Sequence, residues 1–233
     1  MQDESAGAVP PVIAIDGPAA SGKGTIAQGV AMALGYRYLD SGSLYRIVAL
    51  QAVRQQVAVD DEPRLAAIAD GLDLSLGEGR ILVADHDVTE AIRAEPVSAA
   101  ASRVAILPRV RTALLTRQRA FRAAPGLVAE GRDMGTVVFP DARLKIYLTA
   151  SAEARASRRY KQLIDKGNPV TIDGLLRDIR ERDARDSARA EAPLRVAADA
   201  IVLDTTDMPA DAVIACVLQK YQALTADGPR ARN

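Results

Sequence analysis

A glycine-rich segment near the start of the sequence has the residue types and the spacing to bind the phosphates of a nucleotide. Residues 16–25 read DGPAASGKGT and stand between an apolar run at residues 12–16 and a helical pattern at residues 25–34. Glycines let the backbone wrap around an anion, so that successive N–H groups point at phosphate oxygens. A helix N-terminus adds partial positive charge there, and a lysine such as Lys23 reaches the β- and γ-phosphates. The segment therefore predicts a P-loop that binds ATP.

The end of this segment departs from the usual P-loop pattern. Most P-loops carry Ser or Thr directly after the lysine, whereas here Gly24 follows Lys23 and the hydroxyl belongs to Thr25. The ending GKGT resembles that of the nucleoside monophosphate kinases. We expect Thr25 to contact Mg²⁺, directly or through water. The residues expected to bind the donor are Gly17, Pro18, Ala19, Ala20, Ser21, Gly22, Lys23, Gly24 and Thr25.

Two further segments place polar side chains and arginines where a second anionic ligand would bind. LDSGSLYR at residues 39–46 stands at a strand-to-helix junction, and EGRDMGT at residues 130–136 follows an apolar strand. The carboxyl ends of parallel strands open into the binding crevice of an α/β sheet. A plain helix cap explains Ser41 equally well, and charges at a strand end can simply be solvated. Next to a P-loop, we favour the functional interpretation.

A third segment, residues 180–189, carries Arg182, Arg185 and Arg189 at spacings of three and four, which puts them on one helix face. A surface ladder of salt bridges with Asp186 would give the same pattern. The P-loop again makes phosphate binding the better hypothesis.

The preceding helical pattern, residues 151–166, holds Arg155, Arg158 and Arg159 and ends at a Gly-Asn-Pro break. Such a helix could close over bound phosphates and exclude water, which would otherwise compete as the phosphoryl acceptor.

The elements that must position these residues alternate between strand and helix. This alternation predicts an α/β fold with a parallel sheet covered by helices. Strands are expected at residues 12–16, 36–39, 127–130, 144–148 and 200–203, and helices at 25–34, 41–57, 97–122 with a new start at Pro108, 151–166, 171–190 and 209–223. Residues 72–76 and 81–84, separated by Gly77-Glu78-Gly79, indicate a hairpin in an inserted lobe at about 60–96.

Composition limits the classes of partner. Acidic and basic residues number 30 each, so no overall field attracts a nucleic acid polymer or an anionic membrane. The single cysteine, Cys216, fits a reducing compartment, and neither a signal peptide nor a membrane-spanning run is evident. We therefore expect a cytoplasmic, monomeric protein. Of the 30 basic residues 25 are arginines, which reflects either genomic base composition or phosphate recognition by guanidinium groups.

Taken together, these motifs resemble the bacterial cytidylate kinases over nearly the whole chain. The resemblance is carried by IAIDGP at residues 13–18, LDSGSLYR, PRVR at 108–111 continuing to RQRAF at 117–121, EGRDMGTVVFPDA at 130–142 and ERDARDSARAEAPL at 181–194. It implies a P-loop NTPase fold with an inserted NMP-binding lobe and a short helical lid. The core would comprise residues 9–40 and 108–225, the lobe 41–107 and the lid 152–170, with flexible tails at 1–8 and 226–233.

The resemblance also implies the reaction and the roles of individual residues. It implies phosphorylation of CMP, and of dCMP, by ATP with Mg²⁺, through direct in-line transfer. From the P-loop and the arginine pattern together, we expect Lys23, Arg132, Arg158 and Arg182 to be catalytic. Substrate would be bound by Ser41, Tyr45, Arg46, Ser102, Arg111, Arg132, Asp133, Arg182, Asp186 and Arg189. Among these, Arg46, Arg132 and Arg182 would face the phosphates, whereas the division of base and sugar contacts among the others stays open.

The hydrogen-bonding groups of cytosine are compatible with recognition of the base by a carboxylate. A carboxylate such as Asp133 can accept a hydrogen bond from N4, while Arg111 and Ser102 can donate to N3 and O2. Uracil has a carbonyl at the N4 position, and an unpaired buried group is costly, so discrimination can be large. Two alternatives remain: a kinase for UMP, AMP or a non-nucleotide acceptor, and a non-catalytic regulator that binds ATP. The sequence lacks the DxxG and NKxD segments of a guanine-nucleotide switch.

Overall fold

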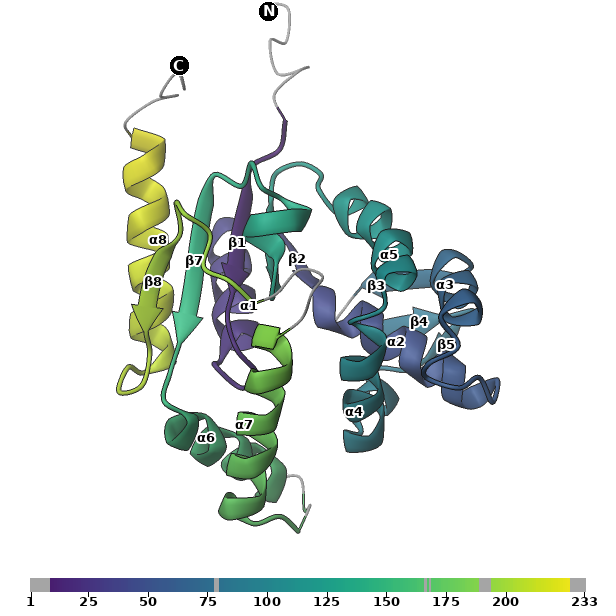
Figure 1. The fold of residues 1–233 in the computed structure, drawn as a ribbon. Helices are drawn as coiled ribbons and strands as arrows, with labels where there is room; N and C mark the ends of the chain where they lie inside the picture. The colour runs from purple at the N-terminus through teal and green to yellow at the C-terminus, as the bar shows by residue number, and fades with distance from the viewer. Residues whose placement is uncertain (1–8, 78–79, 166, 168, 189–193, 227–233) are drawn as a thin grey trace, which may run out of the picture. The chain divides into compact units, whose positions relative to one another are not determined.

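The computed structural model describes residues 9–77, 80–165, 167, 169–188 and 194–226 (Figure 1). The chain divides into two compact units, one formed by residues 1–39 with 121–233 and the other by residues 40–120.

The first unit is built on a five-stranded sheet with the strand order β2-β6-β1-β7-β8. Strand β1 pairs in parallel with β6 and β7, and β7 pairs in parallel with β8. In this register Asp16, at the end of β1, lies opposite Gly131 and Tyr147. The segments that follow β1, β6 and β7 therefore leave the sheet at one edge. The strands are β1 (Val12–Asp16), β2 (Arg37–Asp40), β6 (Leu127–Gly131), β7 (Leu144–Thr149) and β8 (Ile201–Asp204).

Helices α1 (Lys23–Leu34) and α8 (Ala210–Ala226) pack against one face of this sheet. Alternate residues of β1, Ile13 and Ile15, point into the same cluster as Val30 of α1 and Val217 of α8, and all four are fully buried. On β1 itself, the residues of the other face are equally buried, and a short π-helix, η2 (Met134–Val138), packs there. Strand β1 is thus buried on both faces, which explains its uninterrupted apolar sequence.

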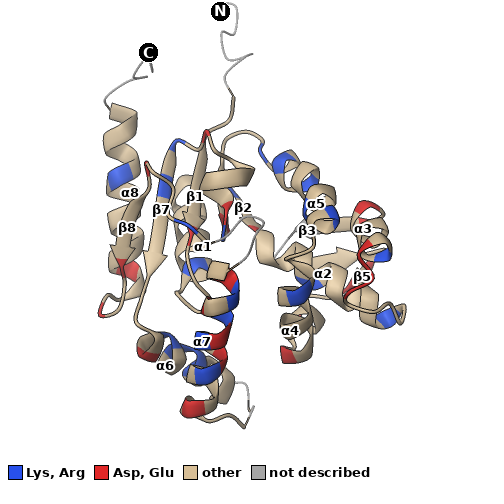
Figure 2. Ribbon diagram, viewed as in Figure 1, with Lys and Arg blue, Asp and Glu red and all other residues tan. Residues whose placement is uncertain are grey.

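Two further helices of this unit, α6 (Ala152–Ile164) and α7 (Ile172–Ala188), pack against each other. Helix α6 begins just after the carboxyl end of β7 (Figure 1). Ser151 caps α6 because its Oγ accepts a hydrogen bond from the backbone N–H of Ala154 at 3.1 Å. Basic and acidic positions are mixed along α7, whereas α6 is mostly basic (Figure 2).

The second unit contains five helical segments and a three-stranded antiparallel sheet among its described residues. Helix α2 is its centre: Leu44, Ile47 and Val48 are fully buried, and α3 and α4 pack against α2. The elements are α2 (Ser41–Arg54), α3 (Glu62–Asp70), β3 (Leu74–Gly77), β4 (Arg80–Val83), β5 (His86–Asp87), η1 (Ala91–Arg93), α4 (Glu95–Val104) and α5 (Pro108–Ala120).

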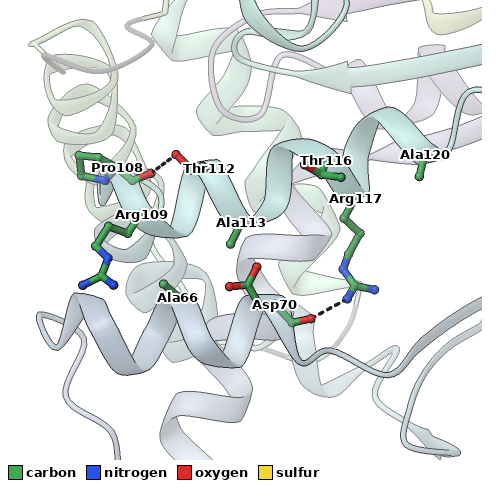
Figure 3. A pocket seen from close by; sticks show the side chains of 9 residues that line it. All are labelled: Ala66, Asp70, Pro108, Arg109, Thr112, Ala113, Thr116, Arg117 and Ala120. Atoms are coloured by element: carbon green, nitrogen blue, oxygen red, sulfur yellow. Dashed lines mark hydrogen bonds between the residues drawn. The ribbon is translucent and has the colours of Figure 1, made fainter.

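Helix α5 lies along α3, and a groove of about 810 Å³ runs between them (Figure 3). Glu62 Oε1 accepts a hydrogen bond from the backbone N–H of Arg109 at 2.7 Å, and Arg117 Nη2 donates to the carbonyl of Asp70 at 3.2 Å. These contacts group α5 with the second unit, whereas the sequence predicts that residues 108–120 belong to the core. None of the residues predicted to bind the acceptor is among those that line this groove.

The expected α/β fold is confirmed, with differences in detail. The sequence does not predict helix α3 and strand β5, because the hairpin signal dominates residues 60–96. The helix expected at residues 97–122 is two helices, α4 and α5, and the second begins at Pro108 as expected. Glu78, Gly79, Asn168 and the segments 1–8 and 227–233 lie outside the described residues, whereas residue 226, expected in a flexible tail, ends α8.

Candidate active site

The loop after β1 has the backbone of an anion-binding turn. Gly17 has a φ of +153°, and a Cβ at this position would overlap the backbone carbonyl oxygen of Leu148. Gly22 precedes α1 with a φ of 89°, and Ala20 is left-handed with a φ of 57°. No side chain of the described residues caps the N-terminus of α1. The first N–H groups of α1 are therefore left for a ligand, as a polyphosphate site requires.

Lys23 is buried in this loop, where its Nζ donates to the carbonyl of Pro18 at 2.8 Å. Burial, together with the nearby charge of Arg132, lowers the pKa of Lys23 to about 7. The charge of Arg182 also lowers the pKa of Lys23, whereas the charge of Glu130 raises it. Three of the predicted phosphate-binding cations thus lie within electrostatic range of one another. Such a cluster is stabilised by an anionic ligand.

Two carboxylates stand at the ends of the central strands, and sequence reasoning did not select either. Asp16 accepts hydrogen bonds from the backbone N–H groups of Met134 and Gly135, both at 2.8 Å. Burial raises the pKa of Asp16 to about 6, although these two hydrogen bonds act against the rise. Asp16 therefore fixes the start of η2, directly after the Arg132-Asp133 pair that the sequence singled out.

Glu130, at the end of β6, accepts a hydrogen bond from the hydroxyl of Tyr38 at 2.6 Å. A Cβ on Gly24 would lie 3.0 Å from Glu130 Oε1. This short distance to Glu130 explains why Gly24, rather than the usual Ser or Thr, follows Lys23. A local sequence pattern contains no signal for it, because Glu130 is more than a hundred residues away.

The structure brings together two of the residues expected to contact the acceptor. Arg132 Nε and Asp186 Oδ2 form an ion pair at 2.7 Å, and the Asp186 side chain is 1% exposed. Arg182 precedes Asp186 by about one turn on α7, and Asp133 is buried at the start of η2. Arg189, the remaining candidate of the segment 180–189, lies outside the described residues.

Arg158, on α6, contacts the backbone rather than an open pocket. Its guanidinium donates to the carbonyls of Thr205 and Thr206, the latter at 3.3 Å, and reaches the carbonyl of Ser21 at 3.5 Å. The predicted catalytic role of Arg158 stays a prediction, but the structure places its guanidinium beside the donor loop.

In the second unit, α2 carries three of the predicted acceptor residues in its first two turns. Asp40 rather than Ser41 is the N-cap of α2, since Asp40 Oδ1 accepts from the backbone N–H of Ser43 at 3.1 Å. Asp40 Oδ2 also forms an ion pair with Arg46. Asp40 is a further residue that sequence reasoning passed over, although an Asp before a helical pattern is a common capping signal.

Arg111 of α5 and Tyr45 of α2 lie together. Arg111 Nη1 donates to the Tyr45 hydroxyl at 3.4 Å and to the carbonyl of Ala105 at 3.3 Å. Ser102, on the adjacent helix α4, is partly exposed. The structure thus groups Arg111 with Tyr45, and their assignment to the substrate stays a prediction.

The side chains of the donor loop fit ATP with Mg²⁺. Ser21 Oγ is buried and has no hydrogen-bond partner among the described residues, so it offers a donor to a phosphate oxygen. The Thr25 side chain is exposed on the first turn of α1. The described residues contain no group of three or more His, Cys, Asp or Glu that could hold a metal.

The sheet order, the strand-loop-helix turn and the buried Lys23 define a P-loop NTPase fold. The family model described as cytidylate kinase matches residues 13–223. The chain belongs to the cytidylate kinase family, and the resemblance stated from the motifs is confirmed.

Curated relatives agree with this family. The chain is 58% identical to the cytidylate kinase of Burkholderia multivorans over 214 residues, which cover 92% of this chain and 94% of the relative. It is 55% identical to that of Chromobacterium violaceum over 218 residues, covering 94% and 98%. A solved structure of an uncharacterised protein from Eubacterium ventriosum aligns with a TM-score of 0.52 at 10% identity, covering 91% and 99% of the two chains, and shares the fold. In the part of the chain that the structure describes, every helix is too short or too polar to cross a membrane.

Proposed function

We propose that this protein transfers the γ-phosphoryl group of ATP to CMP, giving ADP and CDP, and that it also accepts dCMP. The observation that carries the proposal is the family match over residues 13–223, within which the P-loop lysine is buried among arginines. A kinase of another acceptor is less well supported, because the curated relatives at 55–58% identity are named cytidylate kinases.

The donor loop would bind the phosphates of ATP through its N–H groups and through Lys23. Bound Mg²⁺ would neutralise charge on the β- and γ-phosphates. Lys23, Arg132 and Arg182 would stabilise the charge that spreads over the transferring group. Lys23 and Arg132 are already held by hydrogen bonds to Pro18 and Asp186, so little reorganisation of these two cations is needed during the reaction. The CMP phosphate oxygen is itself the nucleophile, and no covalent enzyme intermediate is required.

The carboxylate of Asp133 would accept a hydrogen bond from the cytosine amino group, and Arg111 and Ser102 would donate to the ring acceptors. Arg46 would contact the acceptor phosphate, and Asp186 the ribose.

We assign the acceptor-binding role to the lobe that the sequence placed at residues 41–107, and the lid to residues 152–170. We also propose a cytoplasmic monomer. Light scattering at the concentration used in the assay tests the oligomeric state. A mass of twice 24.7 kDa would reject the monomer.

The proposed activity is tested by ADP release from Mg-ATP with CMP, dCMP, UMP or AMP supplied separately as acceptor. Fast turnover with CMP and dCMP, slow turnover with UMP and none with AMP is expected, and chromatography should identify CDP as the product. Turnover with UMP or AMP equal to that with CMP would reject the cytosine site. ATP binding without transfer to any acceptor would favour the non-catalytic regulator.

A further inference from the structure

Three carbonyl oxygens of the donor loop point at cations of the protein. The carbonyl of Pro18 accepts from Lys23 Nζ at 2.8 Å, and that of Ala19 accepts from Arg155 Nη1 at 3.1 Å. The carbonyl of Ser21 lies 3.5 Å from Arg158 Nη1. A carbonyl oxygen turned towards a phosphate would repel it, whereas an N–H group attracts it. The cations therefore hold the loop in the orientation in which its N–H groups are free for the ligand.

The loop needs such support at its middle. Ala20 has a φ of 57°, a conformation that residues with a side chain adopt only when the surroundings impose it. The contact from Arg155 holds the peptide group directly before Ala20. The sequence groups Arg155 with Arg158 and Arg159 as residues that face phosphates, but the structure turns Arg155 to the backbone instead.

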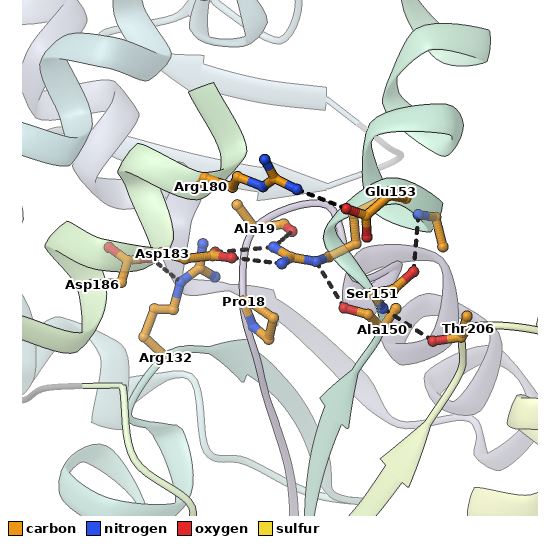
Figure 4. A network of polar contacts seen from close by, with 12 residues as sticks. Pro18, Ala19, Arg132, Ala150, Ser151, Glu153, Arg180, Asp183, Asp186 and Thr206 are labelled. Atoms are coloured by element: carbon orange, nitrogen blue, oxygen red, sulfur yellow. Dashed lines mark hydrogen bonds and ion pairs between the residues drawn. The ribbon is translucent and has the colours of Figure 1, made fainter. Parts of the chain in front are cut away.

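Arg155 is anchored by every part of its guanidinium, and the residue is only 5% exposed. Nε donates to the carbonyl of Ala150 at 3.0 Å, while Nη1 and Nη2 contact Asp183 Oδ1 and Oδ2 at 3.0 and 2.5 Å. Asp183 stands on α7, beside Arg182 and one turn before Asp186. Figure 4 shows Asp183 between Ala19 of the donor loop on one side and the Arg132–Asp186 pair on the other.

We propose that Arg155, held by Asp183, is a positioning residue that sets the donor loop for ATP. Arg155 does not touch ATP; it acts through the carbonyl of Ala19. The inference rests on the proposed function, because the ligand it serves is the phosphoryl donor. It adds to that function a physical link from the donor loop to the helix that carries Arg182 and Asp186.

The variant Arg155→Lys is the most direct test. Lysine keeps the charge, but a single ammonium group on a flexible chain cannot reproduce the planar fork that serves Ala19, Ala150 and Asp183 at once. Because charge-assisted buried hydrogen bonds are lost, ATP affinity measured by calorimetry without an acceptor should fall about 10- to 100-fold. The KM for CMP should stay within about threefold of the wild-type value, since no acceptor contact is removed.

The matched control is Arg180→Gln. Arg180 also pairs α7 with α6, through Glu153 at 2.9 Å, but the two side chains are 61% and 63% exposed. Its loss should leave ATP affinity within about twofold of wild type, as expected of a surface ion pair. A loss equal to that of Arg155→Lys would show that only helix docking matters and would overturn the proposal.

The partner variant Asp183→Asn keeps one acceptor for Arg155 and should weaken ATP binding by less, about 3- to 10-fold. The double variant should lose less than the product of the two single effects, because both act through one contact. Asp183→Asn carries the test alone if Arg155→Lys fails to fold in thermal unfolding. Wild-type ATP affinity in folded Arg155→Lys, or in Asp183→Asn alone, would refute the proposal. A wild-type protein that binds ATP but does not phosphorylate CMP would instead refute the proposed function and leave this test valid.

Discussion

Replacing Asp16 with asparagine should change how the stability of the protein depends on pH. Asp16 is buried at the end of β1 and accepts two backbone hydrogen bonds at 2.8 Å. Burial raises its pKa from 3.8 to about 6, and the nearby charge of Asp133 contributes to the rise. Lys23 is the facing cation and acts in the opposite direction. Asparagine has a similar shape but cannot titrate.

The sign follows from the direction of the shift. The pKa of Asp16 is higher in the folded protein than in the unfolded chain, so the folded state binds the proton more tightly. The contribution of Asp16 to the free energy of unfolding is therefore present below pH 3.8 and is lost as the pH rises through about 6. Between about pH 4 and pH 7, the free energy of unfolding of wild type minus that of Asp16→Asn should fall by about 2–3 kcal/mol.

Urea unfolding of both proteins across this pH range measures the difference, in which the titration of groups that do not interact with Asp16 cancels. Asp141→Asn is a control of opposite sign. The hydrogen bond from Arg122 holds the pKa of Asp141 below its ordinary value, so the corresponding difference should rise with pH. A wild-type minus Asp16→Asn difference that is constant or rises with pH would refute the reasoning about burial.

Three substitutions test the site and the loop. Lys23→Ala should lower turnover about 1000-fold, because a preorganised charge at the transferring group is lost, while urea unfolding shows an intact fold; near-normal turnover would reject the donor-site assignment. Asp133→Ala should reduce the ratio of kcat/KM for CMP over UMP at least about 10-fold, and an unchanged ratio would place base reading elsewhere. Gly17→Ala should destabilise the fold by about 3 kcal/mol or more in urea unfolding, since φ is +153° and Leu148 leaves no room for a Cβ; wild-type stability would contradict the close approach of Leu148 to this turn.

The sequence predicted those parts of the fold whose signals are local. Strand β1 is an uninterrupted apolar run because both its faces are buried. Helix α1 starts directly after the glycine-rich loop, and no side chain of the described residues caps its N-terminus. Helix α3 was missed because its weakly apolar residues stand beside a hairpin signal that dominated the interpretation. Its buried face is small, with only Leu65, Ala66 and Ala69.

The residues of the site could be predicted where they all lie in one short motif. Contacts between residues that are far apart in the sequence could not be predicted. The P-loop is contiguous, so its residues could be named. The contacts Asp16–Gly135 and Arg132–Asp186 join residues 119 and 54 positions apart. Each partner stands in a motif, but nothing local says that the two touch. Resemblance to a family predicts that Arg132 and Asp186 bind the substrate, and only the structure shows that they form an ion pair with each other.

The excess of arginine over lysine has two possible explanations, genomic base composition and phosphate recognition by guanidinium groups. The contacts of individual arginines distinguish between them. Arg93 and Arg180 form ion pairs that are largely exposed; lysine could replace them at little cost, so base composition is a sufficient explanation there. Arg155 is different, because one buried guanidinium serves two carbonyls and both oxygens of a carboxylate. A lysine could not satisfy that geometry. At Arg155, the requirement for arginine is therefore a requirement of the protein backbone that shapes the phosphate site.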